Sequence, residues 1–171
     1  MNTFEAVQTM LAVRNYRKEQ IPAEIVTRIV RAGQLTGSSM NTQQWDFVVI
    51  QDPQTLKKLG ELASTGSYIA KAALAIAVVV PDNSVGHIDG TRAVQDMMLV
   101  AWGEGIGSNW VGNVNTRPIK ELLNVPQERM VLTIVPFGYP AEELGRGKKD
   151  RKPLTEVAHT EKFDRPYRPA K

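Results

Sequence analysis

The stretch TGSSMNTQQWDFVVI, residues 36–50, joins a helical pattern over residues 23–35 to an alternating strand pattern over residues 45–50. Its first half is rich in small or hydrogen-bonding residues. Such residues let the backbone approach a flat ligand closely and offer amides that donate to it. A loop held between a helix and a strand therefore suggests a binding edge on a rigid scaffold, although most polar connections of this kind bind nothing.

Composition predicts one soluble globular domain spanning residues 1–171. The chain is 42% hydrophobic and 23% charged, which is typical of such a domain. No apolar run approaches the ~18 residues that a membrane span needs, and the N-terminus lacks the pattern of an export signal. The absence of cysteine excludes disulfides and thiolate chemistry and suits a reducing cytoplasm.

The net charge of +3 is unevenly distributed along the chain. Residues 146–171 carry nine basic and four acidic side chains (+5), whereas the rest carries 12 basic and 14 acidic (−2). We therefore predict an extended basic C-terminal tail. Such a tail could meet nucleic acid or a phosphate-bearing cofactor, but no aromatic and basic residues alternate as in a base-stacking surface, so we expect no nucleic-acid partner.

Periodicity predicts helices over residues 3–12, 22–35, 53–63, 90–103 and 117–123, and strands over residues 45–50, 74–80, 109–111 and 130–136. Residues 13–22 are expected to be a polar connection, and residues 81–90 a flexible loop that ends at a capping Asp89. This order predicts an α+β domain of three layers, with a mixed, mainly antiparallel sheet flanked by helices. Residues 97–102 are apolar all round, so their helix should be enclosed by the core or by a second subunit.

No residue pattern supports catalysis by side chains alone. His87 and His159 lie 72 positions apart without cysteines or acidic pairs at metal-ligand spacing, so no metal site is predicted. The glycines at 103, 105 and 107 follow a helix rather than a strand, which excludes a dinucleotide-binding loop. Because no nucleophile or acid–base pair is evident, we expect any chemistry to come from an organic cofactor.

Five segments together resemble the nitroreductase family of FMN flavoproteins. Ser38-Ser39-x-Asn41-x-Gln43-x-Trp45 is similar to the family's PSxxNxQPW signature, with Gly37 and Gln44 in place of its two prolines. The other segments, VRNY at 13–16, GIGSNWVG at 105–112, LLNVP through VLTIVPFGYPAE at 122–142, and RKPLTEV at 151–157, agree in order and spacing. The resemblance covers residues 4–157.

This resemblance implies a nitroreductase-like fold and a homodimer that binds FMN where the two subunits meet. It also implies hydride transfer from NAD(P)H through flavin N5 to a small acceptor, such as a nitroaromatic or a quinone. Arg14 matches the basic residue at the flavin pyrimidine edge, where it would stabilise negative charge near N1. Gly112 and Asn113 match the turn that faces N5, although glycine is commoner at the second position.

Two further groups of residues are implied to bind FMN. Ser38, Ser39 and Asn41 match the loop that the second subunit lays along the flavin, whereas Gln43 and Trp45 would brace this loop. Lys149 and Arg151, two positions apart, match the basic pair on the phosphate, and two cations suit a dianion. The Ser64–Ser67 loop is a looser match.

One departure from the family concerns the phosphate. Met10, Leu11 and Ala12 stand where the family has Arg-Arg-Ser. Losing a charge-assisted contact costs about 1.5–3 kcal/mol, so FMN binding should be weaker than is usual and should depend more on Lys149 and Arg151.

Three alternatives remain open from the sequence. The same fold and flavin could support dehydrogenation, reductive dehalogenation or fragmentation of the flavin. The missing Arg-Arg-Ser favours a non-catalytic flavin-binding relative. A basic-tailed nucleic-acid binder is the third. NADH and NADPH are equally compatible with the sequence.

Overall fold

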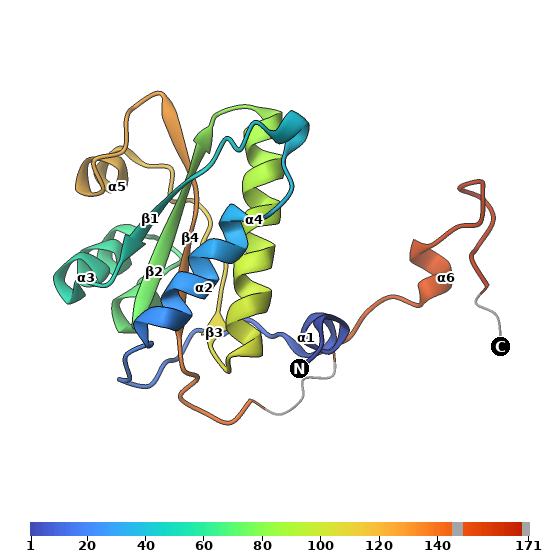
Figure 1. The fold of residues 1–171 in the computed structure, drawn as a ribbon, viewed down its shortest axis with the longest axis horizontal. Coiled ribbons are helices and arrows are strands. Elements are labelled where there is room, and N and C mark those ends of the chain that lie inside the picture. The colour runs from blue at the N-terminus through green and yellow to red at the C-terminus, as the bar shows by residue number, and fades with distance from the viewer. Residues whose placement is uncertain (145–148, 169–171) are drawn as a thin grey trace.

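The computed structural model describes residues 1–144 and 149–168 (Figure 1). Predicted tail residues 145–148 and 169–171 lie outside the described part. The helices are α1 (Thr3–Thr9), α2 (Ala23–Gln34), α3 (Pro53–Leu62), α4 (Ser84–Gly103), α5 (Arg117–Leu122) and α6 (Leu154–Val157). The strands are β1 (Asp46–Ile50), β2 (Leu74–Pro81), β3 (Gly107–Ser108) and β4 (Arg129–Gly138), and short 3-10 turns occupy Ser39–Asn41 and Ser67–Lys71.

The strands form one sheet in the order β1-β2-β4-β3, and its three pairings are antiparallel. Helices α2 and α4 cover one face, and α3 and α5 cover the other (Figure 1). The prediction of a three-layer α+β domain with a mainly antiparallel sheet is confirmed.

Strand β2 is the centre of the core. Its sequence, LAIAVVVP, shows no polar alternation, which predicts burial on both faces. Leu74, Ile76, Val78 and Val80 pack with α2 and α4, whereas the alternate residues pack with α3 and α5. A strand enclosed in this way fixes the two helical layers relative to each other.

The predicted loop over residues 81–90 is wrong, because α4 begins at Ser84. Asn83 caps it, and its side-chain oxygen accepts a hydrogen bond from the Gly86 amide at 2.8 Å. The nearby glycines suggest a loop, but they allow close packing instead. A Cβ on Gly90 would lie 2.8 Å from Leu132 Cδ2 and Val80 Cγ1. Asp89, predicted to be the cap, is therefore an internal and fully buried residue of the helix.

Other parts of the chain also differ from prediction. Helix α1 ends at Thr9, three residues early, and the predicted strand over residues 109–111 is replaced by β3 with an isolated bridge at Val111. Residues 13–22 are not a purely polar connection, because Val13, Tyr16 and Ile21 are buried. Polar residues at positions 14, 15 and 17–20 separate these three side chains, so they form no continuous apolar pattern.

The chain beyond Lys149 leaves the body of the molecule. Helix α6 and the turn closed by the His159–Pro166 bridge lie well away from the sheet (Figure 1). The extended form of the tail agrees with its weak periodicity. Within the described residues, no helix combines the length and the apolar character that crossing a membrane requires.

Candidate functional site

Arg14 is positioned by the close approach of its segment to β3. The Val13 amide donates to the Ser108 carbonyl oxygen at 2.9 Å, and Ala12 forms a parallel bridge with Ser108. Gly107 makes this approach possible, because a Cβ there would lie 2.4 Å from Val13 Cγ2. The Arg14 side chain itself is exposed.

Two tyrosines, Tyr16 and Tyr68, pack beside the segment that carries Arg14. Tyr16 packs over Gly138, where a Cβ would lie 2.8 Å from the tyrosine ring, and its hydroxyl donates to the Val13 carbonyl oxygen at 2.6 Å. Burial raises the pKa of Tyr16, with a further contribution from Tyr68 and an opposing one from Arg14. Tyr16 is therefore a neutral structural residue that fixes the turn carrying Arg14.

Tyr68 links this segment to the chain that leads into the Gly112–Asn113 turn, which is predicted to face flavin N5. It packs against Val13 and Tyr16, and its hydroxyl accepts a hydrogen bond from the Asn109 side-chain amide. Thr65 Oγ1 donates to the Gly112 carbonyl oxygen at 3.4 Å. The Ser64–Ser67 loop thus lies against the turn, and Tyr68 links this loop to Val13, the residue before Arg14.

The backbone of the turn explains why asparagine stands at position 113. Asn113 has φ 55°, in the left-handed region, and asparagine tolerates that region better than most residues with a side chain. The nearest atom to a Cβ built on Gly112 is Trp110 Nε1 at 3.9 Å. The turn is therefore compact and leaves space for a ligand on the Gly112 side.

Lys149 and Arg151 lie near the end of α1. Lys149 Nζ donates to the Val7 carbonyl oxygen at 2.6 Å. Desolvation lowers the pKa of Lys149, and the neighbouring Arg151 lowers it further. Helix α1 is also held to the last turn of α4, because Trp102 Nε1 donates to Thr9 Oγ1 at 2.9 Å. The two cations thus lie at the same end of α4 as Arg14.

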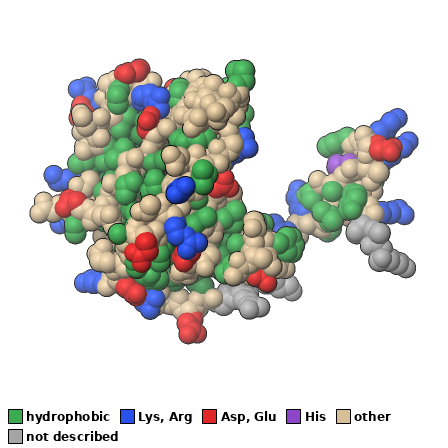
Figure 2. Space-filling view, in the orientation of Figure 1, with side chains coloured by type: hydrophobic (Ala, Val, Ile, Leu, Met, Phe, Trp, Pro, Cys, Tyr) green, Lys and Arg blue, Asp and Glu red, His purple; other side chains and the backbone are tan. Residues whose placement is uncertain are grey.

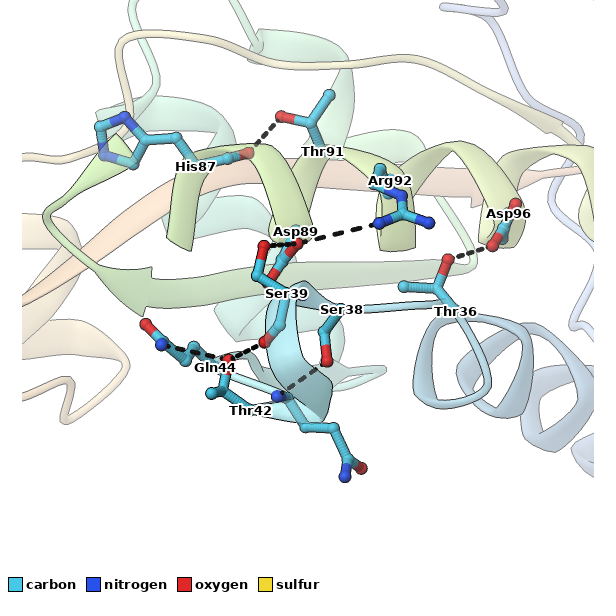
Figure 3. A network of polar contacts seen from close by, with 11 residues as sticks. Thr36, Ser38, Ser39, Thr42, Gln44, His87, Asp89, Thr91, Arg92 and Asp96 are labelled. Atoms are coloured by element: carbon cyan, nitrogen blue, oxygen red, sulfur yellow. Dashed lines mark hydrogen bonds and ion pairs between the residues drawn. The ribbon is translucent and has the colours of Figure 1, made fainter. Parts of the chain in front are cut away.

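The loop that carries Ser38, Ser39 and Asn41 lies near the opposite end of α4. The Ser39 amide donates to Asp89 Oδ2 at 3.0 Å, and Figure 3 shows the loop held against α4 by such contacts. Asp89 precedes the last helical residue, Gly103, by 14 positions, which is about 21 Å at 1.5 Å per residue. In one chain the structure therefore keeps this loop apart from Arg14.

Sequence reasoning missed Asp89 as a partner of this loop. The signal was present, because the buried residues of α4 include Gly86, Asp89, Ala93, Val94 and Met97 at helical spacing. Placing the cap at Asn83 instead would have put Asp89 on the buried face. The predicted bracing residue Trp45 is buried and packs in the core beside Phe47.

The histidines and the surface groove lie outside this set of residues. His87 contacts Asp82 at 3.1 Å in the first turn of α4, and the His159 ring stacks on Phe163. Within the described ranges, no three His, Cys, Asp or Glu side chains gather as a metal site would need. An open groove of about 690 Å³ between α2 and β1 includes Trp45 and Asp46, but none of the predicted cofactor residues.

The residues at the β3 end suit FMN in their chemistry. An exposed guanidinium fits the electron-rich edge of a reduced ring, a compact turn with open space fits its flat edge, and two neighbouring cations fit a phosphate. Desolvation and the neighbouring Arg151 lower the pKa of Lys149, and a bound phosphate would oppose both effects by stabilising the charged form.

The comparisons with known proteins agree with this chemistry. A sequence profile of the family described as "Putative TM nitroreductase" matches residues 2–168. The chain is 30% identical over 168 residues to an Archaeoglobus fulgidus protein named "Putative NADH dehydrogenase/NAD(P)H nitroreductase", covering 92% of this chain and 96% of that one. It is 27% identical to the Bacillus subtilis "FMN reductase [NAD(P)H]", covering 89% and 70%.

A solved structure supports the same relationship. The FMN-dependent nitroreductase of Clostridium difficile R20291 is 25% identical, with a TM-score of 0.84, and the match covers 94% of this chain and 99% of that one. With the family profile extending over nearly the whole sequence, the resemblance of the five motifs is confirmed, and the chain belongs to the nitroreductase family.

Proposed function

We propose that this protein is an FMN-dependent oxidoreductase that passes a hydride from NAD(P)H to a small acceptor, such as a nitroaromatic, a quinone or a similar conjugated compound. The observation that carries the proposal is that the Arg14 segment and Lys149 lie near the C-terminal end of α4, while the Ser64–Ser67 loop and Tyr68 link this region to the segment that carries the Gly112–Asn113 turn. The names of the relatives support the same cofactor and electron donor.

FMN, when bound, supplies hydride chemistry at its N5 atom, and the chain's own residues bind and orient it. Arg14 holds a permanent positive charge where negative charge develops on reduction. Lys149 and Arg151 would bind the phosphate, and the Gly112–Asn113 backbone would contact the ring. No side chain is required to act as acid or base, in agreement with the sequence.

We also propose a homodimer in which the loop of one copy completes the site of the other. The positions of Ser39 and Arg14 near opposite ends of α4 in one chain support it. Apolar exposure supports it as well: Phe4 is 74% exposed on α1. The projecting tail shows hydrophobic side chains on its surface (Figure 2), and its exposed apolar residues are Leu154, Val157, Phe163 and Tyr167.

Apolar side chains that are grouped on one exposed segment favour an interface. The tail projects from the rest of its own chain and carries such residues, so it is well placed to pack against a second copy. We therefore regard residues 1–171 as one domain whose tail, residues 146–171, serves the assembly. The cysteine-free composition supports a cytoplasmic location.

The test is an anaerobic reductive half-reaction. Purified protein is loaded with FMN, freed of excess flavin and mixed with NADH or NADPH while the visible flavin absorbance is followed. We expect at least one nicotinamide to bleach the flavin and a quinone or nitroaromatic to restore its colour. Protein that binds no FMN contradicts the proposal, and bound flavin that neither nicotinamide reduces favours the non-catalytic relative.

A further inference from the structure

Asp89 is a fully buried carboxylate whose contacts lie with the 36–44 loop and one arginine. Its Oδ2 accepts from the Ser39 amide at 3.0 Å, and its Oδ1 accepts from Ser39 Oγ at 3.4 Å. Arg92 Nη1 lies 4.0 Å away on the next turn of α4 (Figure 3). Because a buried charge is unfavourable unless it is paired and hydrogen-bonded, Asp89 and the loop stabilise each other.

The loop has a backbone that needs such support. Met40, Asn41 and Gln43 have φ 49°, 57° and 49°, a region that residues with side chains rarely adopt. Conformations of this kind persist where surrounding contacts hold them, and they concentrate at functional sites. Ser38 contributes one such contact inside the loop, since its Oγ accepts from the Gln43 amide at 3.0 Å.

Helix α4 holds the start of the loop as well. Thr36 Oγ1 donates to the Asp96 carboxylate. A Cβ on Gly37 would lie 2.9 Å from Arg92 Nη2, so glycine at this position lets the guanidinium lie over the loop. Gly37, which stands in place of the family's proline, therefore leaves room for Arg92, the arginine that faces Asp89.

The contacts give two residues of the loop different roles: Ser39 anchors the loop to α4, and Asn41 remains exposed. The Ser39 amide donates to Asp89 and its hydroxyl faces the same buried carboxylate, so Ser39 is turned toward α4 and serves as the anchor. Asn41 is exposed, and its side-chain amide has no hydrogen-bond partner within the described part of the chain. We propose that Asp89 is a positioning residue: it holds the strained loop so that Asn41, rather than Ser39, contacts the FMN bound by a second copy.

This inference rests on the proposed function, and a double-mutant cycle tests it. The dissociation constant for FMN is measured by flavin fluorescence titration for wild type, Asp89→Asn, Asn41→Ala and the double variant. We expect Asp89→Asn to raise the constant about tenfold, the effect of one well-placed hydrogen bond. If Asp89 acts through Asn41, the double variant should bind no more weakly than Asn41→Ala alone.

Hydrogen exchange in the absence of FMN gives a second readout. Asp89→Asn should expose the loop amides, that of Ser39 above all, and leave those of β2 protected. Asp52→Asn is the matched control, because Asp52 is a carboxylate that caps α3 on the other face of the sheet; it should bind FMN as wild type does. If Asp89→Asn fails to fold, Ser39→Pro replaces it in the cycle, because proline removes both donors to Asp89 and follows an extended Ser38.

The outcomes separate the inference from the function on which it rests. Wild type that binds no FMN contradicts the proposed function itself. Wild type that binds FMN, with Asn41→Ala weaker and Asp89→Asn or Ser39→Pro unchanged, overturns only the positioning role. Additive losses in the double variant also overturn it, because they mean that Asp89 or Ser39 acts independently of Asn41.

Discussion

Lys149 and Val7 join the beginning of the C-terminal tail to helix α1, with the lysine Nζ 2.6 Å from the valine carbonyl oxygen. That carbonyl is among the last four of α1, which lack donors within the helix. The contact places a partly desolvated cation beside Arg151. An ammonium group in this setting favours an anion, and the FMN phosphate is the anion that the proposed function supplies.

FMN affinity should depend on the protonation of Lys149. The charged form is disfavoured in the free protein, so its pKa is lowered from 10.5, and a phosphate dianion would raise it again. Affinity should therefore fall as pH rises from neutral through this lowered pKa. Lys149→Arg should keep its affinity over the same range, because arginine stays charged. Titrations at several pH values measure this, and identical profiles for the two proteins would contradict the role.

Removing the charge provides the companion measurement. Lys149→Ala should raise the FMN dissociation constant by about 10- to 100-fold at neutral pH, the loss of one charge-assisted hydrogen bond. The absence of the family's Arg-Arg-Ser at residues 10–12 makes this loss harder to compensate. Wild-type affinity after replacing both Lys149 and Arg151 with alanine would refute the role of the tail in binding phosphate.

Gly107→Ala should displace the segment that carries Arg14. The added methyl would lie 2.4–2.8 Å from three carbons of Val13 in a buried contact, and overpacking of this kind costs about 1–3 kcal/mol of stability. Denaturant unfolding should show the loss, and FMN should bind more weakly. Adding Val13→Ala should restore part of the binding; a double variant weaker than Gly107→Ala would contradict this account.

Phe4→Asp should dissociate the dimer. Phe4 is 74% exposed in the single chain. If the dimer interface buries this side chain, replacing it removes about 1.5–3 kcal/mol of association free energy, which corresponds to roughly a 10- to 100-fold weaker dimer. Sedimentation velocity measures the change. Leu62→Asp, on α3 and 39% exposed, is the control and should remain dimeric. A Phe4→Asp protein that sediments with wild type would remove α1 from the interface.

Asp52 makes a pH-dependent contribution to stability away from the site. Hydrogen bonds from the Thr55 side chain and amide lower its pKa below 3.8. Its contribution is therefore present above that value and is lost as pH falls through the lower folded-state pKa. Asp52→Ala should melt at a lower temperature than wild type at neutral pH, and the gap should narrow in acid. A difference in melting temperature that does not change with pH would mean that the effect does not come from the charge of the carboxylate.

The sequence predicts the parts of this fold in which local and global preferences agree. The apolar run of β2 predicts a buried strand, and Asp52-Pro53 predicts the start of α3. It misplaces α4 because Gly86 and Gly90 resemble loop residues, whereas they are required for close packing against the sheet. That requirement depends on which strand lies beneath the helix, which no local pattern contains.

The candidate site is predictable in a similar way only in part. The resemblance of the motifs predicts roles for Arg14, Asn41 and Gly112, and these roles stay predictions. Asp89 escapes notice, since its partner Ser39 lies 50 positions away and the pairing exists only once the helix and the loop are both placed. The positive φ at Asn113 accounts for an asparagine that the motif alone leaves as a departure.

The central claim is that Arg14 of one copy and the Asn41 loop of the other bind the same FMN. Mixed dimers of an Arg14→Ala chain and an Asn41→Ala chain, isolated through different affinity tags, test it by FMN titration. If the site is shared, one of the two sites in each mixed dimer contains both native residues, so half of the sites should bind FMN with wild-type affinity. If no site in the mixed dimer regains wild-type affinity while each parent variant binds weakly, both residues serve the same chain and the account is contradicted.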